Sequence, residues 1–308
     1  MTLVVTVIGS ESIWLLADRR LSFKDRPPKD DARKVMFLET TDGVAILGYA
    51  GLGATGLGTE PADWMSAVLR GRNLPLEQSI GALAEAMKKQ FPRHMVRMPG
   101  DAGPAHSVMV PAFLGKEPRL YEIGLVFAPD RKRYAFRCTR HVVDKPGLAA
   151  PKTPRIGIAG SGALYLQNQD KKWMRSLLRV VRANDRGHVS PVAVSDHFAS
   201  LNSEVHLGIR DKSVGPGCIV AWRYRKGGVY NGGGGHQFYT GTIRDSSVPC
   251  LPTIAGGMDI QALLSVEMPR FNKRLAAMLA GEQPVEENKD AINAELARLP
   301  DKPDENLR

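Results

Sequence analysis

The first fifty residues alternate short apolar runs with turn signals, a pattern that predicts a group of strands. The runs cover residues 3–8, 13–17, 34–38 and 44–50. Thr41, Asp42 and Gly43 supply a turn signal between the last two runs. The connections are short, whereas parallel strands need crossovers of about a dozen residues, so we predict antiparallel pairing.

Two helices are predicted to follow these strands. Thr59 is placed as a helix cap with Pro61 in the first turn. Residues 76–91 carry an apolar stripe at helical spacing that includes Ile80 and Met87. The pattern therefore changes from short apolar runs to apolar residues at helical spacing.

The remaining elements repeat this order of strands and then helices. Further strands are expected at 108–114, 120–127, 134–140, 155–159 and 218–224, the last pairing with 228–230 or 237–239. Helices are expected at 163–181, 192–205, 262–280 and 290–299. Segregated runs of this kind indicate an α+β fold, which two face-to-face antiparallel sheets with a helix layer on each outer side would satisfy. We expect one domain over residues 1–244 and a partly helical extension over 245–308.

Composition narrows the location of the protein. No apolar run is long enough to span a membrane, and Glu11 follows the first apolar stretch almost at once, unlike a secretory signal. Cys138, Cys218 and Cys250 are far apart and form neither a disulfide framework nor a metal-ligand spacing. We therefore predict a cytoplasmic protein with no metal and no cofactor.

Charge is distributed unevenly along the chain. The net charge is +10, but residues 282–308 hold eight acidic and four basic residues, so this tail carries −4 and the rest +14. A basic body can attract nucleic acid or an acidic partner, although a solvated basic surface is the commoner role. No RNA-binding aromatic motif accompanies the basic residues, so nucleic acid is not the expected partner. Salt-dependent binding would identify a nucleic-acid binder.

Gly51, Gly53 and Gly56 match the glycine pattern of dinucleotide-binding loops. That loop opens a helix directly within a βαβ unit. Here the helix start is delayed to Thr59, and the preceding strands are expected to be antiparallel. We therefore expect no dinucleotide cofactor.

Thr2 is the first candidate for chemistry. Once Met1 is removed, Thr2 would carry a hydroxyl nucleophile and, in its free amine, a base with a pKa near 8. Asp18 ends a buried run and needs a partner, and Lys34 begins another apolar run sixteen residues later. An ammonium beside Thr2 would favour the alkoxide, with Asp18 orienting Lys34. The alternatives are that Thr2 only begins a strand and that Asp18 and Lys34 form an ordinary ion pair.

Gly48 lies near a strand end, where its N–H is placed to stabilise an oxyanion. With Gly48 included, the chain resembles the β-type subunits of the proteasome, among the N-terminal-nucleophile threonine hydrolases. Thr2, Asp18, Arg20, Lys34 and Gly48 fall at the spacings of that family, with sixteen, sixteen and fourteen residues between Thr2, Asp18, Lys34 and Gly48.

Two later segments extend the resemblance. Gly160, Ser161 and Gly162 look like the turn before the third helix of the family, and Ser161 maps to a serine that hydrogen-bonds near the nucleophile. Asp211 and Ser213 resemble the later Asp and Ser of the same site. The resemblance covers roughly residues 2–240.

The resemblance implies a four-layer αββα sandwich, peptide-bond cleavage by Thr2, self-association into rings and an ATPase unfoldase as a further partner. It also implies a substrate pocket, apolar here, lined by Leu21, Ala32, Met36, Ile46 and Ala50 and flanked by Arg20. Two alternatives stay open: a catalytically silent scaffold subunit that retains Met1, and a hydrolase of small amides with the same fold.

Overall fold

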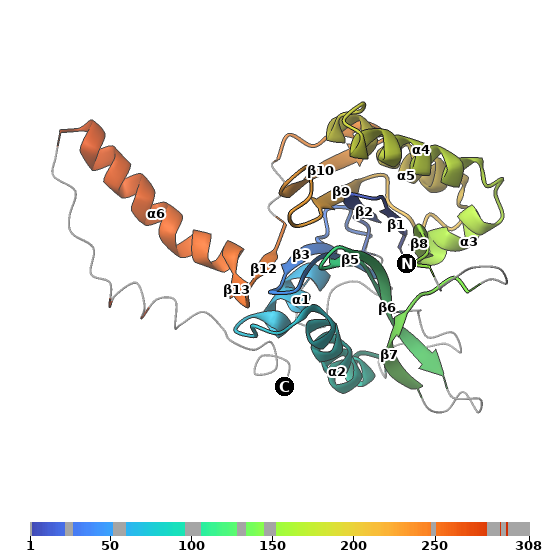
Figure 1. The fold of residues 1–308 in the computed structure, drawn as a ribbon, viewed down its shortest axis with the longest axis horizontal. Helices are drawn as coiled ribbons and strands as arrows, with labels where there is room; N and C mark the ends of the chain where they lie inside the picture. The colour runs from blue at the N-terminus through green and yellow to red at the C-terminus, as the bar shows by residue number, and fades with distance from the viewer. Residues whose placement is uncertain are drawn as a thin grey trace.

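The computed structural model describes residues 2–21, 27–51, 60–95, 106–127, 134–144, 152–247 and 251–281, together with residues 290 and 294. Two sheets lie face to face, and helices cover both outer faces (Figure 1). This is a four-layer αββα sandwich, so the predicted fold class is confirmed.

The first sheet contains the strand that follows Thr2. Its strands are β1 (Val4–Ile8), β2 (Ser12–Asp18), β8 (Ile156–Ala159), β9 (Cys218–Tyr224), β10 (Gly233–Thr240) and β11 (Ile243–Arg244). Their order is β11-β10-β9-β2-β1-β8, and the neighbouring strands are antiparallel. β1 therefore lies between β2 and β8, near one edge of the sheet. Of the two pairings expected for β9, the one with residues 237–239 is found.

The second sheet carries the strand that follows Lys34. Its strands are β3 (Val35–Glu39), β4 (Gly43–Ala50), β5 (Ser107–Leu114), β6 (Glu117–Phe127), β7 (Tyr134–Arg140), β12 (Thr253–Ala255) and β13 (Met258–Asp259). Their order is β13-β12-β3-β4-β5-β6-β7, and only the pair of β12 with β3 is parallel. Two short strands from the predicted C-terminal extension thus complete this sheet, while the division at residue 244 stays a prediction.

Helices shield the outer face of each sheet. The second sheet is covered by α1 (Pro61–Leu69) and α2 (Leu76–Met95), and the first sheet by α3 (Ser161–Gln167), α4 (Lys172–Asp185) and α5 (Pro191–Gly208). The last helix, α6 (Ile260–Leu279), covers neither sheet and extends away from the sandwich (Figure 1). None of the helices in the described ranges is long and apolar enough to cross a bilayer.

One predicted helix, 163–181, is two helices in the structure. α3 ends at Gln167, and α4 begins at Lys172, whose N–H donates to the Asp170 carboxylate at 3.2 Å. An aspartate side chain that satisfies a free N–H at a helix start favours a new helix over a continuous one. The predicted start at Thr59 and the predicted helix 290–299 lie outside the described residues, apart from residues 290 and 294.

The core has three layers because both faces of the central strands are buried. In β1, Val5 and Val7 pack toward the helices, while Val4 and Ile8 pack toward the other sheet. This alternation follows from the two-residue period of a strand. Every residue of β1 and β2 is buried, so these strands fix the position of the residues at their ends.

Candidate active site

Strand register brings Asp18 to Thr2. Val4 of β1 pairs with Ala17 of β2, so the residues just beyond this pair meet at the end of the hairpin. The Leu3 N–H donates to Asp18 Oδ1 at 2.9 Å, and the Asp18 N–H donates to the Leu3 carbonyl at 3.0 Å. The pairing thus fixes the Asp18 carboxylate beside the N-terminal segment.

Lys34 reaches the same point from the second sheet. Its Nζ lies 3.0 Å from Thr2 Oγ1, 3.2 Å from Asp18 Oδ1 and 2.5 Å from the Arg20 carbonyl oxygen. Thr2 and Asp18 are fully buried, and Lys34 is 1% exposed. The sequence-predicted hydroxyl, ammonium and carboxylate are therefore in direct contact inside the sandwich.

Burial controls the charge of Lys34. Removal from water lowers the pKa of its ammonium, and the neighbouring Asp18 carboxylate opposes this by favouring the charged form. A neutral Lys34 has two N–H groups, which match two acceptors that have no proton of their own, Asp18 Oδ1 and the Arg20 carbonyl. Its lone pair then faces the Thr2 hydroxyl, so this arrangement can accept a proton from Thr2.

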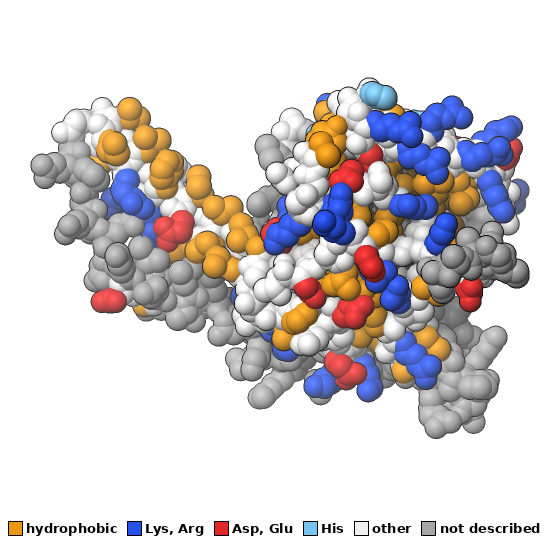
Figure 2. All heavy atoms as spheres, viewed as in Figure 1, with side chains coloured by type: hydrophobic (Ala, Val, Ile, Leu, Met, Phe, Trp, Pro, Cys, Tyr) orange, Lys and Arg blue, Asp and Glu red, His pale blue; other side chains and the backbone are white. Residues whose placement is uncertain are grey.

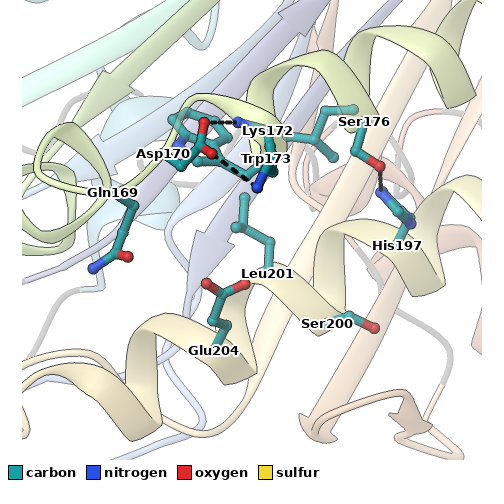
Figure 3. A pocket seen from close by; sticks show the side chains of 10 residues that line it. Gln169, Asp170, Lys172, Trp173, Ser176, His197, Ser200, Leu201 and Glu204 are labelled. Carbon is teal, nitrogen blue, oxygen red and sulfur yellow. Dashed lines mark hydrogen bonds and ion pairs between the residues drawn. The ribbon is translucent and has the colours of Figure 1, made fainter.

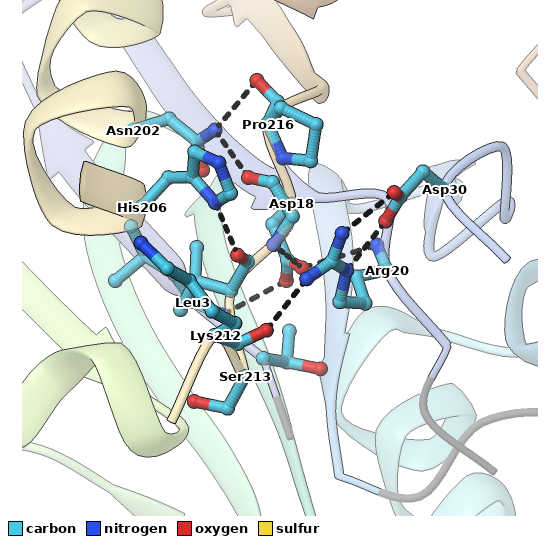
Figure 4. Close-up of polar contacts among 12 residues, drawn as sticks. Leu3, Asp18, Arg20, Asp30, Asn202, His206, Lys212, Ser213 and Pro216 are labelled. Atoms are coloured by element: carbon cyan, nitrogen blue, oxygen red, sulfur yellow. Dashed lines mark hydrogen bonds and ion pairs between the residues drawn. The ribbon is translucent and has the colours of Figure 1, made fainter. Parts of the chain in front are cut away.

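The loop between α5 and β9, residues 209–217, closes the site. Asp18 Oδ2 accepts the N–H of Gly215 at 3.0 Å and that of Arg20 at 3.1 Å (Figure 4). Ser213 Oγ lies 2.8 Å from Ser161 Oγ, and the Ser213 N–H donates to Asp211 Oδ1 at 2.9 Å. The predicted Ser161, Asp211 and Ser213 are thus brought together.

These serines adjoin the backbone of Thr2 rather than its hydroxyl. Ser161 Oγ is 3.5 Å from the Thr2 carbonyl oxygen, which also accepts the Gly162 N–H at 3.2 Å. Gly160 has a φ of +88°, and an added Cβ would lie 2.0 Å from the same carbonyl oxygen. The turn therefore needs glycine at 160 both for its conformation and for the close approach of Thr2.

Arg20 organises the rim of the site through a partner that the sequence analysis missed. Its guanidinium forms a two-bond ion pair with Asp30, at 2.6 and 2.7 Å (Figure 4). The same group donates to the Lys212 carbonyl at 2.7 Å, and Lys212 has a φ of +51°. Since Asp30 lies in an irregular loop, no periodic pattern marked it.

Gly48 lies inside β4, opposite Val35 of β3 and Met109 of β5. An added Cβ would lie 2.6 Å from the Leu15 side chain of the facing sheet. The structure therefore gives Gly48 a packing role, which lets the two sheets approach each other.

The predicted pocket residues divide between two faces of the second sheet. Ile46 and Ala50 belong to the core between the sheets, and Ala50 lies near the Gly160 turn. Leu21 and Ala32 are buried in the segment that holds Arg20. Met36 instead packs in the core beneath α1 and α2. Its side chain is on the opposite face of the sheet, so the structure does not bring it to the pocket.

The chain is therefore a four-layer αββα sandwich with a buried Thr–Lys–Asp contact between its two sheets. Within the described ranges, no group of three His, Cys, Asp or Glu residues could hold a metal ion. No family model matches this chain, and no curated protein matches it.

Solved structures of proteins called Anbu are similar to this chain. The Anbu complex from Pseudomonas aeruginosa, described as a helical assembly, is 14% identical with a TM-score of 0.47, covering 94% of this chain and 99% of that chain. Anbu (ancestral beta-subunit) from Yersinia bercovieri is 11% identical with a TM-score of 0.45, covering 92% and 100%. A Gly-1 mutant of Anbu from Hyphomicrobium sp. strain MC1 is 12% identical with a TM-score of 0.44, covering 76% and 87%.

These comparisons correct the family inferred from the sequence. The similar structures are Anbu proteins, and no family model places the chain among the threonine hydrolases that the motif spacings suggested. The assignment to proteasome β-type threonine hydrolases is therefore wrong. The sequence spacing predicted the contact of Thr2, Asp18 and Lys34, but this contact does not establish family membership. Structural similarity at these low identities does not establish an activity for this chain.

Proposed function

We propose that the chain is an amide hydrolase that uses the Thr2 hydroxyl as its nucleophile after Met1 is removed. The observation that supports this most directly is the 3.0 Å contact between Lys34 Nζ and Thr2 Oγ1, inside a site where burial lowers the pKa of Lys34. A hydroxyl needs an adjacent base to become a nucleophile. The proposal rests on this geometry and not on family membership.

The proton of Thr2 has two candidate acceptors. One is neutral Lys34, whose lone pair faces the hydroxyl when its N–H groups donate to Asp18 and to the Arg20 carbonyl. The other is the α-amine of Thr2, which is free once Met1 is gone and has an ordinary pKa near 8. The α-amine can act as a base near neutral pH, and the lowered pKa of Lys34 brings its amine closer to that range.

In the proposed reaction, Thr2 Oγ1 attacks the amide carbonyl carbon while its proton passes to the base. The tetrahedral intermediate then expels the amine, which takes that proton, and leaves an ester on Thr2. Water hydrolyses the ester with the same base, releasing the acid and restoring the hydroxyl. Ser161, Ser213 and Asp211 would position the Thr2 backbone during these steps. The Gly48 N–H is the proposed donor to the oxyanion of the tetrahedral intermediate.

The substrate side chain is proposed to be apolar, because the predicted pocket residues Leu21, Ala32, Ile46 and Ala50 are apolar and buried. Peptide bonds and small amides share this chemistry. A panel of both types, assayed with the native chain and with Thr2→Ala, tests the proposal. Amide turnover that is lost in Thr2→Ala and retained in part by Thr2→Ser supports it, whereas equal turnover by the native chain and Thr2→Ala refutes it.

A silent scaffold is the second candidate function. The observation in its favour is that Thr2 is fully buried in the chain that carries Met1, so no substrate can reach the hydroxyl in this state. Intact-mass measurement separates the two candidates. A mass lower by one methionine, with threonine as the first residue, favours the hydrolase, and a retained Met1 favours the scaffold.

Self-association is proposed for either candidate. α6 exposes Leu264, Met268, Phe271, Leu275 and Leu279, while Val266 is its one buried residue. Figure 2 shows this apolar surface along the projecting helix. An exposed apolar face of this length indicates a contact with another chain. Ring geometry, an ATPase partner and a cytoplasmic location stay predictions from the sequence.

A further inference from the structure

A polar hollow, which we call the arginine hollow, lies at the opposite end of β1 from Thr2. It has a volume of about 220 Å³ and forms where the turn after β1 meets the last turn of α4. Its polar lining is dominated by Arg155, Arg182 and Arg186, and Leu178 and Val181 form an apolar wall. Figure 2 shows Lys and Arg side chains gathered over the helix layer that contains α4.

Within the described part of the chain, no carboxylate forms an ion pair with any of the three arginines, whereas Arg223 and Arg225 pair with Glu39 and Glu11. Arg155 is held in place because its Nη1 donates to the Gly9 carbonyl at 2.7 Å and to the Ile8 carbonyl at 3.3 Å. Its other N–H groups have no partner among the described residues, so they can donate to a ligand.

Asp185 is the nearby negative group, and its carboxylate is already occupied. Oδ2 accepts the Ser10 N–H at 2.6 Å, the Ser10 hydroxyl at 3.0 Å and the Glu11 N–H at 3.2 Å, and Oδ1 accepts the Ser12 hydroxyl at 2.5 Å. The C-terminal end of α4 adds a partial negative charge of about half a unit. Three guanidinium groups exceed both, so the hollow keeps a net positive charge.

A larger hollow between α4 and α5 does not share this property. Its volume is about 420 Å³, and its lining includes Asp170, Lys172 and Glu204 (Figure 3). Lys172 pairs with Asp170 at 3.1 Å, and Ser176 contacts His197 at 2.8 Å. Its two carboxylates outnumber its one lysine, so this hollow has no surplus of positive charge to attract an anion.

We propose that the arginine hollow is a binding site for a small polyanion with two linked phosphate groups. Planar guanidinium groups bind phosphate oxygens in pairs, and the three here come from two separate elements. A volume of about 220 Å³ corresponds to roughly seven water molecules, which is room for more than one phosphate group. The ligand joins α4 to the turn between β1 and β2, and the site is independent of Thr2.

Titration calorimetry with inorganic pyrophosphate on the full chain tests this proposal. The double variant Arg182→Ala/Arg186→Ala is compared with Arg179→Ala, which removes an equally exposed arginine of α4 that does not line the hollow. We expect the double variant to bind pyrophosphate at least about tenfold more weakly than the native chain, because charge-assisted hydrogen bonds are lost. Arg179→Ala is expected to bind as the native chain does.

Several results would overturn the proposal. One is unchanged binding in the double variant, and another is an equal loss in Arg179→Ala, which would indicate a diffuse basic surface. A third is orthophosphate that binds as tightly as pyrophosphate, because this would show that the hollow does not recognise two linked phosphate groups. All three arginines are exposed, so circular dichroism is expected to show an intact fold in every variant. Thr2→Ala is expected to bind pyrophosphate normally, which keeps this test separate from the proposed hydrolysis.

Discussion

Replacing Lys34 with methionine tests whether the buried contact is an ion pair that holds the two sheets together. The substitution keeps an unbranched side chain, one heavy atom shorter than lysine, and removes its charge. Breaking a buried pair costs about 3–5 kcal/mol, because a charge is left without its partner. Asp18 would still accept three backbone N–H groups, from Leu3, Arg20 and Gly215, so we expect the lower end of that range.

A loss of about 3 kcal/mol in the free energy of unfolding corresponds to a fall of roughly 6–12 °C in Tm for a domain of this size. Asp18→Ala is expected to destabilise the chain more than Lys34→Met, because it leaves the N–H groups of Leu3, Arg20 and Gly215 unpaired, and each of the two buried ones costs about 1–3 kcal/mol. Thr2→Ala is the matched control, since it removes a contact of Lys34 without removing a charge.

Thermal unfolding followed by circular dichroism measures the Tm of each of the three variants and of the native chain. The expected order of destabilisation is Asp18→Ala, then Lys34→Met, then Thr2→Ala, with the last costing about 1 kcal/mol. A Lys34→Met chain as stable as the native one would refute the assignment of a buried ion pair. A Thr2→Ala chain less stable than Lys34→Met would mean that the hydroxyl, and not the charge, anchors the contact.

Three further predictions follow from the same contacts. Gly160→Ala is expected to abolish amide turnover, because the added Cβ would displace the Thr2 carbonyl. The control is Gly227→Ala, at a φ of +67° with open space around it, which is expected to cost about 1–3 kcal/mol of backbone strain and no activity. Equal losses of activity in the two variants would contradict this prediction. Phe271→Glu on α6 is expected to reduce the molar mass measured by light scattering, and the exposed neighbour change Asn272→Glu is not. Turnover is expected to rise with pH as Lys34 loses its proton below its ordinary pKa of 10.5, and a rate that falls over this range would exclude Lys34 as the base.

The strands and their pairing were predictable because apolar runs and turn signals mark them directly. Val4 pairs with Ala17, and this register alone carries Asp18 to the N-terminal segment. The sequence spacing of Asp18 and Lys34 was therefore enough to predict a contact between the two sheets. It was not enough to predict the family, because the same ion pair also serves as a structural link.

The failures come from strands that are buried on both faces. All eight residues of β4 are buried, so no polar–apolar alternation shows which face each side chain occupies. Met36 and Ile46 were both assigned to one pocket although they lie on opposite faces, and Gly48 was taken for a strand end. The break between α3 and α4 was missed because apolar residues continue on both sides of it.

The lowered pKa of Lys34 separates the hydrolase from the scaffold through the sign of its pH dependence. In the window between the lowered folded pKa and 10.5, the unfolded chain binds more protons at Lys34 than the folded chain, so stability rises with pH. In a hydrolase, turnover rises as the pH passes through the lowered folded pKa, because neutral Lys34 accepts the Thr2 proton. In a scaffold, the rise in stability remains without turnover. Lys34→Met removes both slopes, so a turnover that keeps its slope in this variant must use another base, and the free amine of Thr2 is the group in position to serve.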